Sequence, residues 1–505
     1  MRPRTAILAG LAGALSLACV SKSEAPARAE GKPEAEQATV IFTADIWGQL
    51  EPCGCSADML GGLDRAATWV RQQRAEGPTL LVDAGDAFFD ATEYEERDEP
   101  QARRRAEAVA QALVSMGVDA KARFERDTVF PVEAMPAQKL LGGPRVLEAG
   151  GVRLGLVPVD ALHGAGAPAA LAAGVAQARK QGAEVVAALI HAPRQQVLGL
   201  SGAAKQAGAD FVVGSHIDRI ADGEEARMVQ AELPVFFTMA RGQSLLAIEL
   251  LLRGEGPLQI AGNPAEREKE IAGFGERIRS YESRIAALPP DADRAPFEMK
   301  IRELRERRRA LAEEKVQPPA TGSYLAWQFV PVTEDRAGDH AVKEILASYD
   351  RDVAAANLAY AQAHPRACPE PAQGEAVYVG GEACVGCHAA AQAFWKGTGH
   401  AHAFETLETI GKQYDLNCIS CHVTGWERPG GACDVARVEG RKDVTCESCH
   451  GPGSLHAAAP TQVKLPAQVG EQTCKSCHTP ENSTAFDYGT YLQKIVGPGH
   501  GEKAK

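Results

Sequence analysis

Short apolar runs alternate with amphipathic stretches along residues 39–254 of this chain. Runs rich in Val, Ile, Leu and Phe that end in Gly, Asp or Ser predict strands. They occupy residues 40–43, 80–82, 154–157, 185–190, 211–213, 235–239 and 245–252. Between several of them, apolar positions recur at helical spacing, in residues 63–74, 104–116 and 169–181. This alternation predicts an α/β domain in which helices cover sheets, and we assign it to residues 38–255.

Residues 264–318 have a different pattern, rich in Glu and Arg. Six apolar residues, spaced alternately three and four apart, form one seam: Ile271, Phe274, Ile278, Tyr281, Ile285 and Leu288. After Pro289-Pro290, a second charged stretch places Phe297, Ile301 and Leu304 on one face. We therefore predict an antiparallel helical hairpin with solvated charges. We assign residues 319–375 to a connecting region. The pattern of residues 322–363 predicts a strand and a helix that dock this region to its neighbours.

The first 19 residues have the pattern of an export signal. A charged start, Met1 to Arg4, precedes an apolar run that is too short to span a bilayer and that ends at Cys19. The stretch Leu15 to Cys19 resembles a bacterial lipoprotein signal, in which the cysteine is lipidated; ordinary cleavage near Ala18 is the alternative. Residues 20–37 predict a flexible tether. We expect an exported protein, periplasmic or anchored to the outer membrane through this lipid.

Composition narrows the choice of partners. The 505 residues contain 45% hydrophobic and 24% charged residues, as is usual for folded soluble proteins. The net charge of -12 leaves no basic surplus to neutralise a phosphate backbone. We therefore expect no nucleic-acid partner.

Eight of the 13 cysteines lie in four C-x-x-C-H motifs within residues 376–505. The cysteines are Cys384, Cys387, Cys418, Cys421, Cys446, Cys449, Cys474 and Cys477, and the motif histidines are His388, His422, His450 and His478. Two thiols at this spacing each form a thioether to one haem, and the adjoining imidazole reaches its iron. A pair of zinc ribbons would also use repeated C-x-x-C, but zinc does not require a histidine after every motif. The motifs predict four c-type haems in a mainly helical, haem-packed domain.

Other histidines near these motifs are candidates for the second axial ligand of each iron. They are His400, His402, His456 and His500. Two imidazoles on one iron suit electron transfer, whereas a missing one leaves an open site.

Residues 378–500 resemble the cytochrome c554 family of tetrahaem proteins. The likeness rests on Trp395 with His400 and Ala403, on the run 418–425, and on 446–453 with His456. The resemblance implies closely stacked haems with mostly bis-histidine ligation and, in some members, one five-coordinate haem. It implies His388, His422, His450 and His478 as proximal ligands and favours His400, His456 and His500 as distal ones. It leaves His402 open between a ligand and a surface residue.

Two further cysteines, Cys368 and Cys433, flank or lie inside this domain outside the haem motifs. In an oxidising compartment we expect a disulfide between them.

Residues 39–252 resemble the metallophosphoesterase domain of 5'-nucleotidases. The likeness rests on strand-end residues: Asp45, Gly61-Gly62, Asp83 to Asp86, His191, and Gly214 to His216. The resemblance implies two metal ions that activate water. The pattern is altered, because Trp47 replaces a ligand His, Asp218 replaces the last His, and residues 123–127 replace an Asn-His pair. Asp45, Asp86, His191 and His216 remain as a possible site for one divalent metal ion.

The sequence thus predicts an exported multihaem electron carrier that works with redox partner proteins. The alternatives are a haem oxidoreductase acting on a small nitrogen compound and a nucleotide phosphoesterase with an attached redox module. Cys53 and Cys55, in the loop after the first strand, stay open between a strained pair, a soft-metal site and buried thiols.

Overall fold

The computed structural model describes residues 35–52, 60–162, 164, 166–215, 227–254, 256–261, 264–287, 294–313, 319–479, 482–483 and 486–500. The predicted signal peptide and nearly all of the tether lie outside these residues, as do Cys53, Cys55, His216 and Asp218. Among the described residues, no helix is long and apolar enough to cross a membrane.

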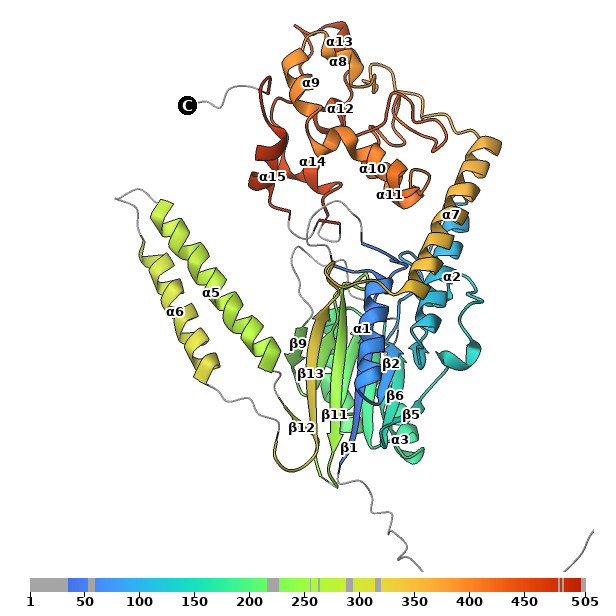
Figure 1. Ribbon diagram of the computed structural model, residues 1–505, viewed down its shortest axis with the longest axis vertical. Helices are drawn as coiled ribbons and strands as arrows, with labels where there is room; N and C mark the ends of the chain where they lie inside the picture. Colours follow the sequence, from blue (N-terminus) through green and yellow to red (C-terminus); the bar gives the residue numbers. More distant parts are fainter. Residues whose placement is uncertain are drawn as a thin grey trace, which may run out of the picture.

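Two sheets form the centre of the α/β domain (Figure 1). The first has the strand order β12-β13-β11-β1-β2-β3-β4 and the second β5-β6-β7-β8-β10-β9. The strands of the first sheet are β1 Glu36–Thr43, β2 Thr79–Asp83, β3 Ala120–Ala122, β4 Leu140–Leu141, β11 Ser244–Leu252, β12 Gln259–Ile260 and β13 Tyr324–Pro331. Those of the second are β5 Arg145–Ala149, β6 Val152–Asp160, β7 Val185–His191, β8 Phe211–Ser215, β9 Arg227–Gln230 and β10 Pro234–Phe237.

The alternation of side chains along β1 explains why the sheets stack. Val40 and Phe42 point into the core between the two sheets, whereas Ile41 points to the outer face. The first sheet's outer face is covered by α1 Leu63–Glu76, α2 Glu99–Ser115 and α7 His340–Ala363. The second sheet's outer face is covered by α3 Ala167–Lys180 and α4 Arg194–Ala207. The result is a four-layer α/β sandwich, as the alternating pattern predicts.

The connecting region contributes to this sandwich. β13 pairs with β11 along its whole length, from Ser244↔Pro331 to Leu251↔Tyr324. Val342, Leu346 and Val353 of α7 are buried in the same core as α1 and α2. The strand and helix expected within residues 322–363 are thus present, and they complete the α/β layer.

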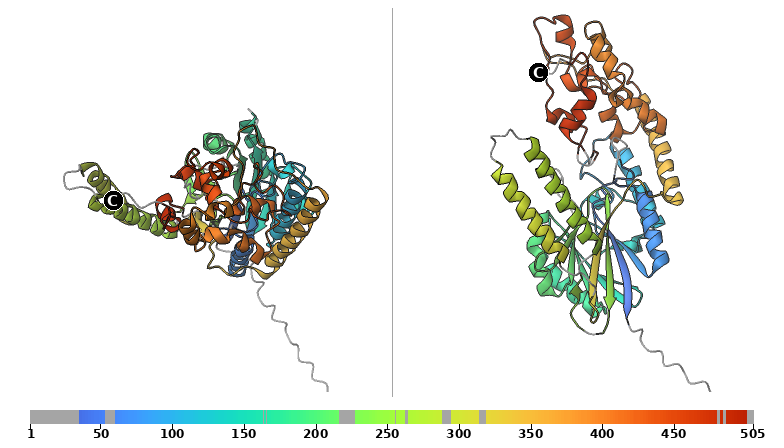
Figure 2. Two further views of the ribbon diagram at one scale, coloured as in Figure 1. Left: turned by 90° about the horizontal axis from the view of Figure 1, so that it is seen from above. Right: turned by 60° about the vertical axis from the view of Figure 1, so that its left-hand side comes forward.

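The predicted hairpin consists of α5 Pro264–Ala287 and α6 Ala295–Glu313. Phe274 and Ile278 of the predicted seam pack against Ile301 and Leu304, so the antiparallel pairing is confirmed. Figure 2 shows the hairpin projecting from the side of the sandwich.

Residues 364–500 form a region of short helices at one end of the sandwich (Figures 1 and 2). The helices are α8 Glu382–Val385, α9 Ala389–Trp395, η3 Gly399–His402, α10 Ala403–Ile410, α11 Leu416–His422, α12 Cys446–His450, α13 Ser454–Ala458, α14 Glu471–Lys475 and α15 Tyr488–Ile495. Its apolar cluster is small, with Phe404, Ile419 and Val438 among its members. A disulfide joins Cys368 and Cys433, as predicted. The multidomain architecture expected from the sequence is therefore confirmed.

Candidate haem-binding region and the strand-end cluster

Each C-x-x-C-H motif forms about one turn of helix. In the first motif, the backbone N–H of His388 donates to the carbonyl of Cys384 at 2.9 Å, and His478 repeats this bond to Cys474 in the fourth. One helical turn places residues three and four apart on the same side. Each motif can therefore present its two thiols and its imidazole to one ligand.

Thiols of different motifs are close to one another. Cys384 of the first motif interacts with Cys446 of the third, and Cys449 of the third interacts with Cys474 of the fourth. Cys477 of the fourth interacts with Cys421 of the second. The motifs therefore follow one another in space in the order first, third, fourth, second.

Two pairs of imidazole rings face each other between elements that are distant in sequence. The ring centroids of His388 and His456 lie 6.3 Å apart, and those of His400 and His478 lie 6.2 Å apart. Burial, followed by the charge of His478, lowers the pKa of His400. A lowered pKa favours the neutral imidazole, the form that binds metals.

Several of these histidines have Nδ1 hydrogen-bonded to a carbonyl oxygen. His422 Nδ1 donates to Ala403, His450 Nδ1 to Pro466 at 2.7 Å, and His456 Nδ1 to Val463 at 2.7 Å. Such a bond fixes the proton on Nδ1 and makes Nε2 the basic nitrogen, as metal-ligating histidines require. The carbonyl partners give no signal in the sequence, because any residue could supply them.

The two remaining candidate ligands have different surroundings. His402 is exposed, and both of its nitrogens are engaged, Nδ1 with Glu405 at 3.0 Å and Nε2 with the Lys396 carbonyl at 3.1 Å. These contacts favour the surface reading of His402. His500 packs edge-on against Phe394, with centroids 6.2 Å apart.

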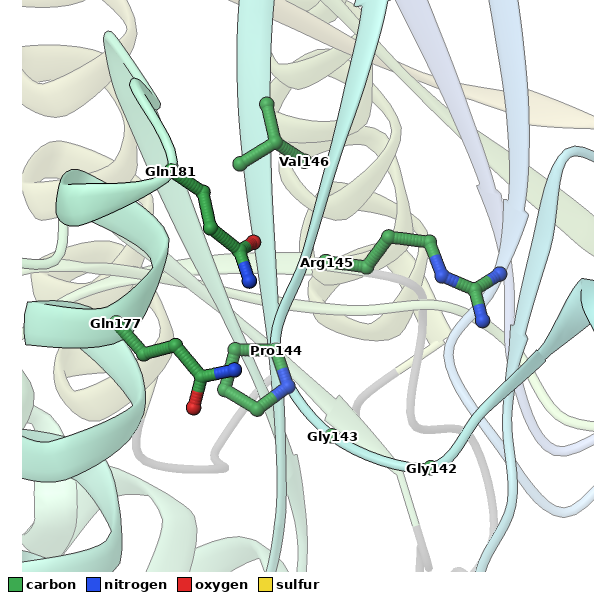
Figure 3. A pocket seen from close by; sticks show the side chains of 7 residues that line it. All are labelled: Gly142, Gly143, Pro144, Arg145, Val146, Gln177 and Gln181. Carbon is green, nitrogen blue, oxygen red and sulfur yellow. The ribbon is translucent and has the colours of Figure 1, made fainter.

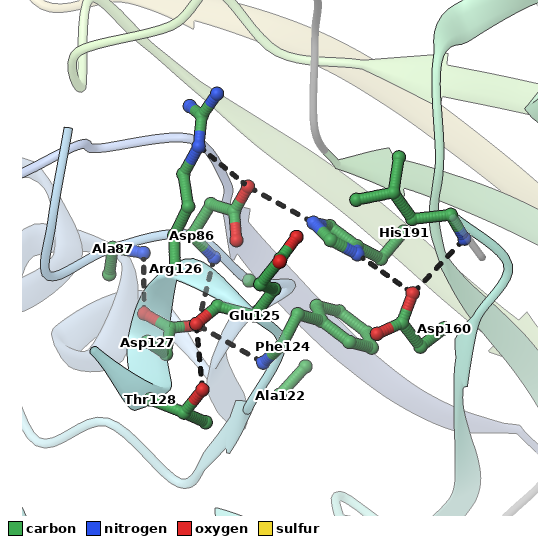
Figure 4. Close-up of polar contacts among 12 residues, drawn as sticks. Asp86, Ala87, Ala122, Phe124, Glu125, Arg126, Asp127, Thr128, Asp160 and His191 are labelled. Atoms are coloured by element: carbon green, nitrogen blue, oxygen red, sulfur yellow. Dashed lines mark hydrogen bonds and ion pairs between the residues drawn. The ribbon is translucent and has the colours of Figure 1, made fainter. Parts of the chain in front are cut away.

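At the strand ends of the sandwich, Asp86 and His191 lie close together, as the sequence predicts (Figure 4). The other neighbours of His191 are residues that were not predicted for this site. His191 Nε2 lies 3.2 Å from Asp86 Oδ2, and Nδ1 lies 3.1 Å from Asp160 Oδ1. The Phe124 ring stacks on the imidazole, with centroids 4.7 Å apart. Burial alone would lower the pKa of His191, but the two carboxylates raise it. Asp160 was not among the residues predicted for this site, although it too ends a strand.

A buried ammonium group lies among the neighbouring carboxylates. Lys121 Nζ is 2.8 Å from Asp83 Oδ1 and 3.0 Å from Asp127 Oδ2, and all three side chains are inaccessible to solvent. Burial alone would lower the pKa of Lys121, but Asp127 and Asp83 raise it. Asp127 also accepts the backbone N–H groups of Asp86 and Ala87. A fixed ammonium therefore supplies positive charge beside the predicted metal ligands.

The backbone at these strand ends has an unusual conformation. Asp45, Trp47 and Asp86 have φ values of 53°, 50° and 54°, in the left-handed region that side chains disfavour. Each such residue costs about 1–3 kcal/mol, and such strain is concentrated at functional sites. Asp45 is fully buried. Within the described residues, no group of three or more His, Cys, Asp or Glu side chains could hold a metal ion. Because His216 is outside them, the four-residue metal site stays a prediction.

A surface recess of about 640 Å³ lies between the turn before β5 and α3 (Figure 3). Its one charged lining residue, Arg145, donates to the carbonyls of Gln138 and Leu140. Arg145 therefore holds the local turn, and we assign no chemistry to this recess.

One family model matches a part of the C-terminal region. Residues 383–451 match the family described as cytochrome c554 and c-prime. No curated protein matches the chain. The chain is thus a multidomain protein that combines an α/β sandwich with a helical C-terminal region, part of which matches this family.

Three solved structures are similar to the chain at low identity. A 5'-nucleotidase precursor from Thermus thermophilus is 14% identical, with a TM-score of 0.38 over 63% of this chain and 59% of its own length. Sulfate thiohydrolase SoxB of Thermus thermophilus, in complex with glycerol, is 14% identical, with a TM-score of 0.39 over 72% of this chain and 68% of its own. The calcineurin-like phosphoesterase YfkN of Bacillus subtilis is 13% identical, with a TM-score of 0.37 over 63% of this chain and 98% of its own.

Proposed function

We propose that this chain is an exported electron-transfer protein that carries four covalently bound haems. The observation that carries the proposal is the pairing of imidazole rings beside the C-x-x-C-H motifs. With metal–imidazole bonds of about 2.0 Å on both sides of one iron, ring centroids lie about 6 Å apart. The pairs His388–His456 and His400–His478 have this spacing. They are the proposed axial ligands of the first and fourth haems.

The contacts between thiols support a linear electron path. Haems attached through neighbouring cysteines have their edges close together, so electrons would pass in the order first, third, fourth, second haem. The second motif lies in α11, which packs beside the α/β domain through Asp415 and Leu416. The first motif is at the far end of the series. A redox partner protein docking there would be farthest from the sandwich.

The experiment is to export the full-length protein in a host that matures c-type cytochromes and to weigh it intact. We expect the mass of four haems, and three for Cys446→Ala. Bound zinc, or fewer than four haems in the wild type, contradicts the proposal.

A second candidate function is catalysis at an open haem iron. The observation that favours it concerns His450. Among the described residues, no second imidazole ring lies beside His450 in the way that His456 lies beside His388. His500 is the proposed distal ligand that would close a third bis-histidine site. Electron paramagnetic resonance separates the two functions. Only low-spin signals support the carrier, whereas a high-spin signal that changes with nitric oxide or hydroxylamine supports the enzyme.

We assign the α/β domain a scaffolding role and expect little or no nucleotide hydrolysis. The contact between His191 and Asp86 supports this assignment, because both are side chains that metal ions would need as ligands. The check is to supply manganese or zinc to the full-length protein and to assay nucleotides. Hydrolysis that disappears in Asp86→Ala would make the domain an enzyme.

A further inference from the structure

A cavity of about 390 Å³ lies where the α/β domain meets the second C-x-x-C-H motif. From the sandwich, Trp47, Arg105 and Arg126 line it, and from α11 Asn417 and Ser420 do so. Ser420 stands between the two cysteines of the motif. Because Cys421 interacts with Cys477 of the fourth motif, one side of α11 faces the other motifs while Asn417 and Ser420 face the sandwich.

Positive charge exceeds negative charge on the walls of this cavity. Four arginines line it, Arg97, Arg105, Arg126 and Arg241, against two carboxylates, Asp90 and Asp98. Arg105 pairs with Asp90 at 2.5 Å, and Arg97 pairs with Asp98 and with Glu427 outside the cavity. Each of the two carboxylates that line the cavity is therefore paired with an arginine.

The other two arginines contact different groups. Arg126 Nε lies 4.0 Å from Asp86 Oδ2, an oxygen that also contacts His191. The Arg126 guanidinium lies over the Trp47 ring, 5.0 Å from its centroid. Arg241 donates to the neutral amide oxygen of Gln49 at 3.3 Å. Figure 4 shows Arg126 reaching toward Asp86 at the edge of the strand-end cluster.

Two donors in the cavity wall are buried without an acceptor among the described residues. They are Nε of Arg105 and Nε1 of Trp47. Both residues are more than nine-tenths buried, with 9% and 7% of their surface exposed. A buried donor that lacks an acceptor costs about 1–3 kcal/mol, so such groups normally have a partner. Trp47 lines the cavity, so an anion there would provide an acceptor for its Nε1 group.

We propose that this cavity binds a tetrahedral oxyanion with two negative charges, either free or as the end group of a small organic molecule. Guanidinium groups bind phosphate and sulfate oxygens with two parallel hydrogen bonds, which suits Arg126 and Arg241. A cavity of this volume is within the range of small-molecule sites. Trp47 and Arg126 lie at positions where the phosphoesterase pattern has a ligand His and an Asn-His pair, so a side-chain cation stands at one of the altered positions. The proposal goes beyond electron transfer and does not depend on the number of haems.

The test is calorimetric titration of the full-length, haem-loaded protein at low ionic strength. Sulfate, inorganic phosphate and adenosine monophosphate are the probes, and nitrate is the monovalent comparison. We expect sulfate or phosphate to bind and nitrate to bind at least about tenfold more weakly. Tighter binding of the monophosphate than of phosphate identifies an organic ester as the ligand class, and the reverse identifies the free ion.

Variants locate the site. Arg126→Gln is expected to weaken binding about tenfold to a hundredfold, because a charged hydrogen bond is lost. Arg126→Lys should restore part of this loss. The matched control is Arg153→Gln, which removes an exposed arginine of the same domain that pairs with Glu184 outside the cavity. Failure of the wild type to bind any of the dianions, or equal losses in Arg126→Gln and Arg153→Gln, overturns the proposal.

Discussion

At the scale of single residues, the buried ion pair of Lys121 is the feature that the sequence could not reveal. The C-x-x-C-H motifs can be read from the sequence because their residues have a fixed spacing. Lys121, Asp127 and Asp160 have no such spacing, and their pairing depends on which strand ends the fold brings together. From the sequence, residues 123–127 could be described only as the replacement of an Asn-His pair. In the structure Phe124 fills space beside His191, and Asp127 neutralises Lys121.

Replacing Lys121 with Met should destabilise the α/β domain by about 3–5 kcal/mol, because Asp83 and Asp127 would remain buried without their cation. Urea unfolding of the full-length protein measures the change. The matched control is Lys205→Met, which removes an exposed partner of Glu232 and should cost less than about 1 kcal/mol. Equal effects of the two substitutions would contradict a structural role for the buried pair.

Replacing His456 with Ala should convert the first haem from low spin to high spin, because His388 would be its one remaining axial ligand. His402→Ala is the matched control, since both nitrogens of His402 contact other groups. Electron paramagnetic resonance and the visible spectrum record the change. A spin change in His402→Ala, with none in His456→Ala, would reverse the assignment of the distal ligands.

At the scale of elements, strands with long apolar runs were predictable, and the short strands at one end of the first sheet were not. β1, β7 and β11 carry continuous runs that only a buried strand explains, whereas β3 and β4 have three and two residues. Helix α4 also escaped prediction. It contains Gly199 and Gly202, and its few buried residues, including Val197 and Ala204, give a weak helical period.

In the C-terminal region, covalent links take the place of a large apolar core. The Cys368–Cys433 disulfide closes a loop with a sequence separation of 65 residues. Removing it with the double substitution Cys368→Ala and Cys433→Ala should destabilise this region by about 4 kcal/mol, through the entropy regained by the unfolded chain. Denaturant unfolding followed through the haem absorbance measures the loss. If the double variant unfolds at the wild-type midpoint, the link contributes nothing to stability.

At the scale of the whole molecule, the two parts meet through polar side chains that sequence patterns cannot pair. Lys412 of the C-terminal region contacts Glu51 of the sandwich and, at 3.5 Å, Asp350 of α7. Burial raises the pKa of Asp350 to about 6, although Lys412 lowers it. The sequence placed α7 in a connecting region, yet this helix packs against the sandwich and also carries residues that bond to the C-terminal region. Its double role follows from tertiary contacts.

The raised pKa of Asp350 makes stability depend on pH. The folded protein binds the proton of Asp350 more tightly than the unfolded chain does. The contribution of Asp350 to the free energy of unfolding is therefore highest below about pH 4, falls as the pH rises toward 6, and stays low above that value. Asp350→Asn should therefore stabilise the protein by about 2 kcal/mol at pH 7 and by almost nothing at pH 4. Thermal unfolding at both pH values tests this, and a pH-independent difference would contradict it.

Gln101 is the centre of the junction between the two parts. Its amide nitrogen donates to Asp415, and its amide oxygen accepts from Asn357 at 2.6 Å and from the backbone N–H of Leu416 at 3.1 Å. The residue is 2% exposed. Gln101→Leu keeps a side chain of similar shape. It removes the hydrogen bonds that Gln101 makes with Asp415, Asn357 and Leu416 inside the junction. Asp415 and Asn357 each keep another hydrogen bond, but the partly buried backbone N–H of Leu416 loses its acceptor, which costs about 1–3 kcal/mol.

The expected result of Gln101→Leu is a junction that opens while both parts stay folded. Hydrogen exchange should become faster in α7 near Asn357 and in α11 near Leu416, with the strands of the sandwich unchanged. Gln111→Leu on the same helix is the matched control, because Gln111 is exposed.

Opening of the junction would also disrupt the arginine-lined cavity, since Gln101 and Leu416 both line it. Sulfate binding should therefore weaken together with the protection of α11. Faster exchange without any loss of sulfate affinity would separate the cavity from the junction and contradict this coupling.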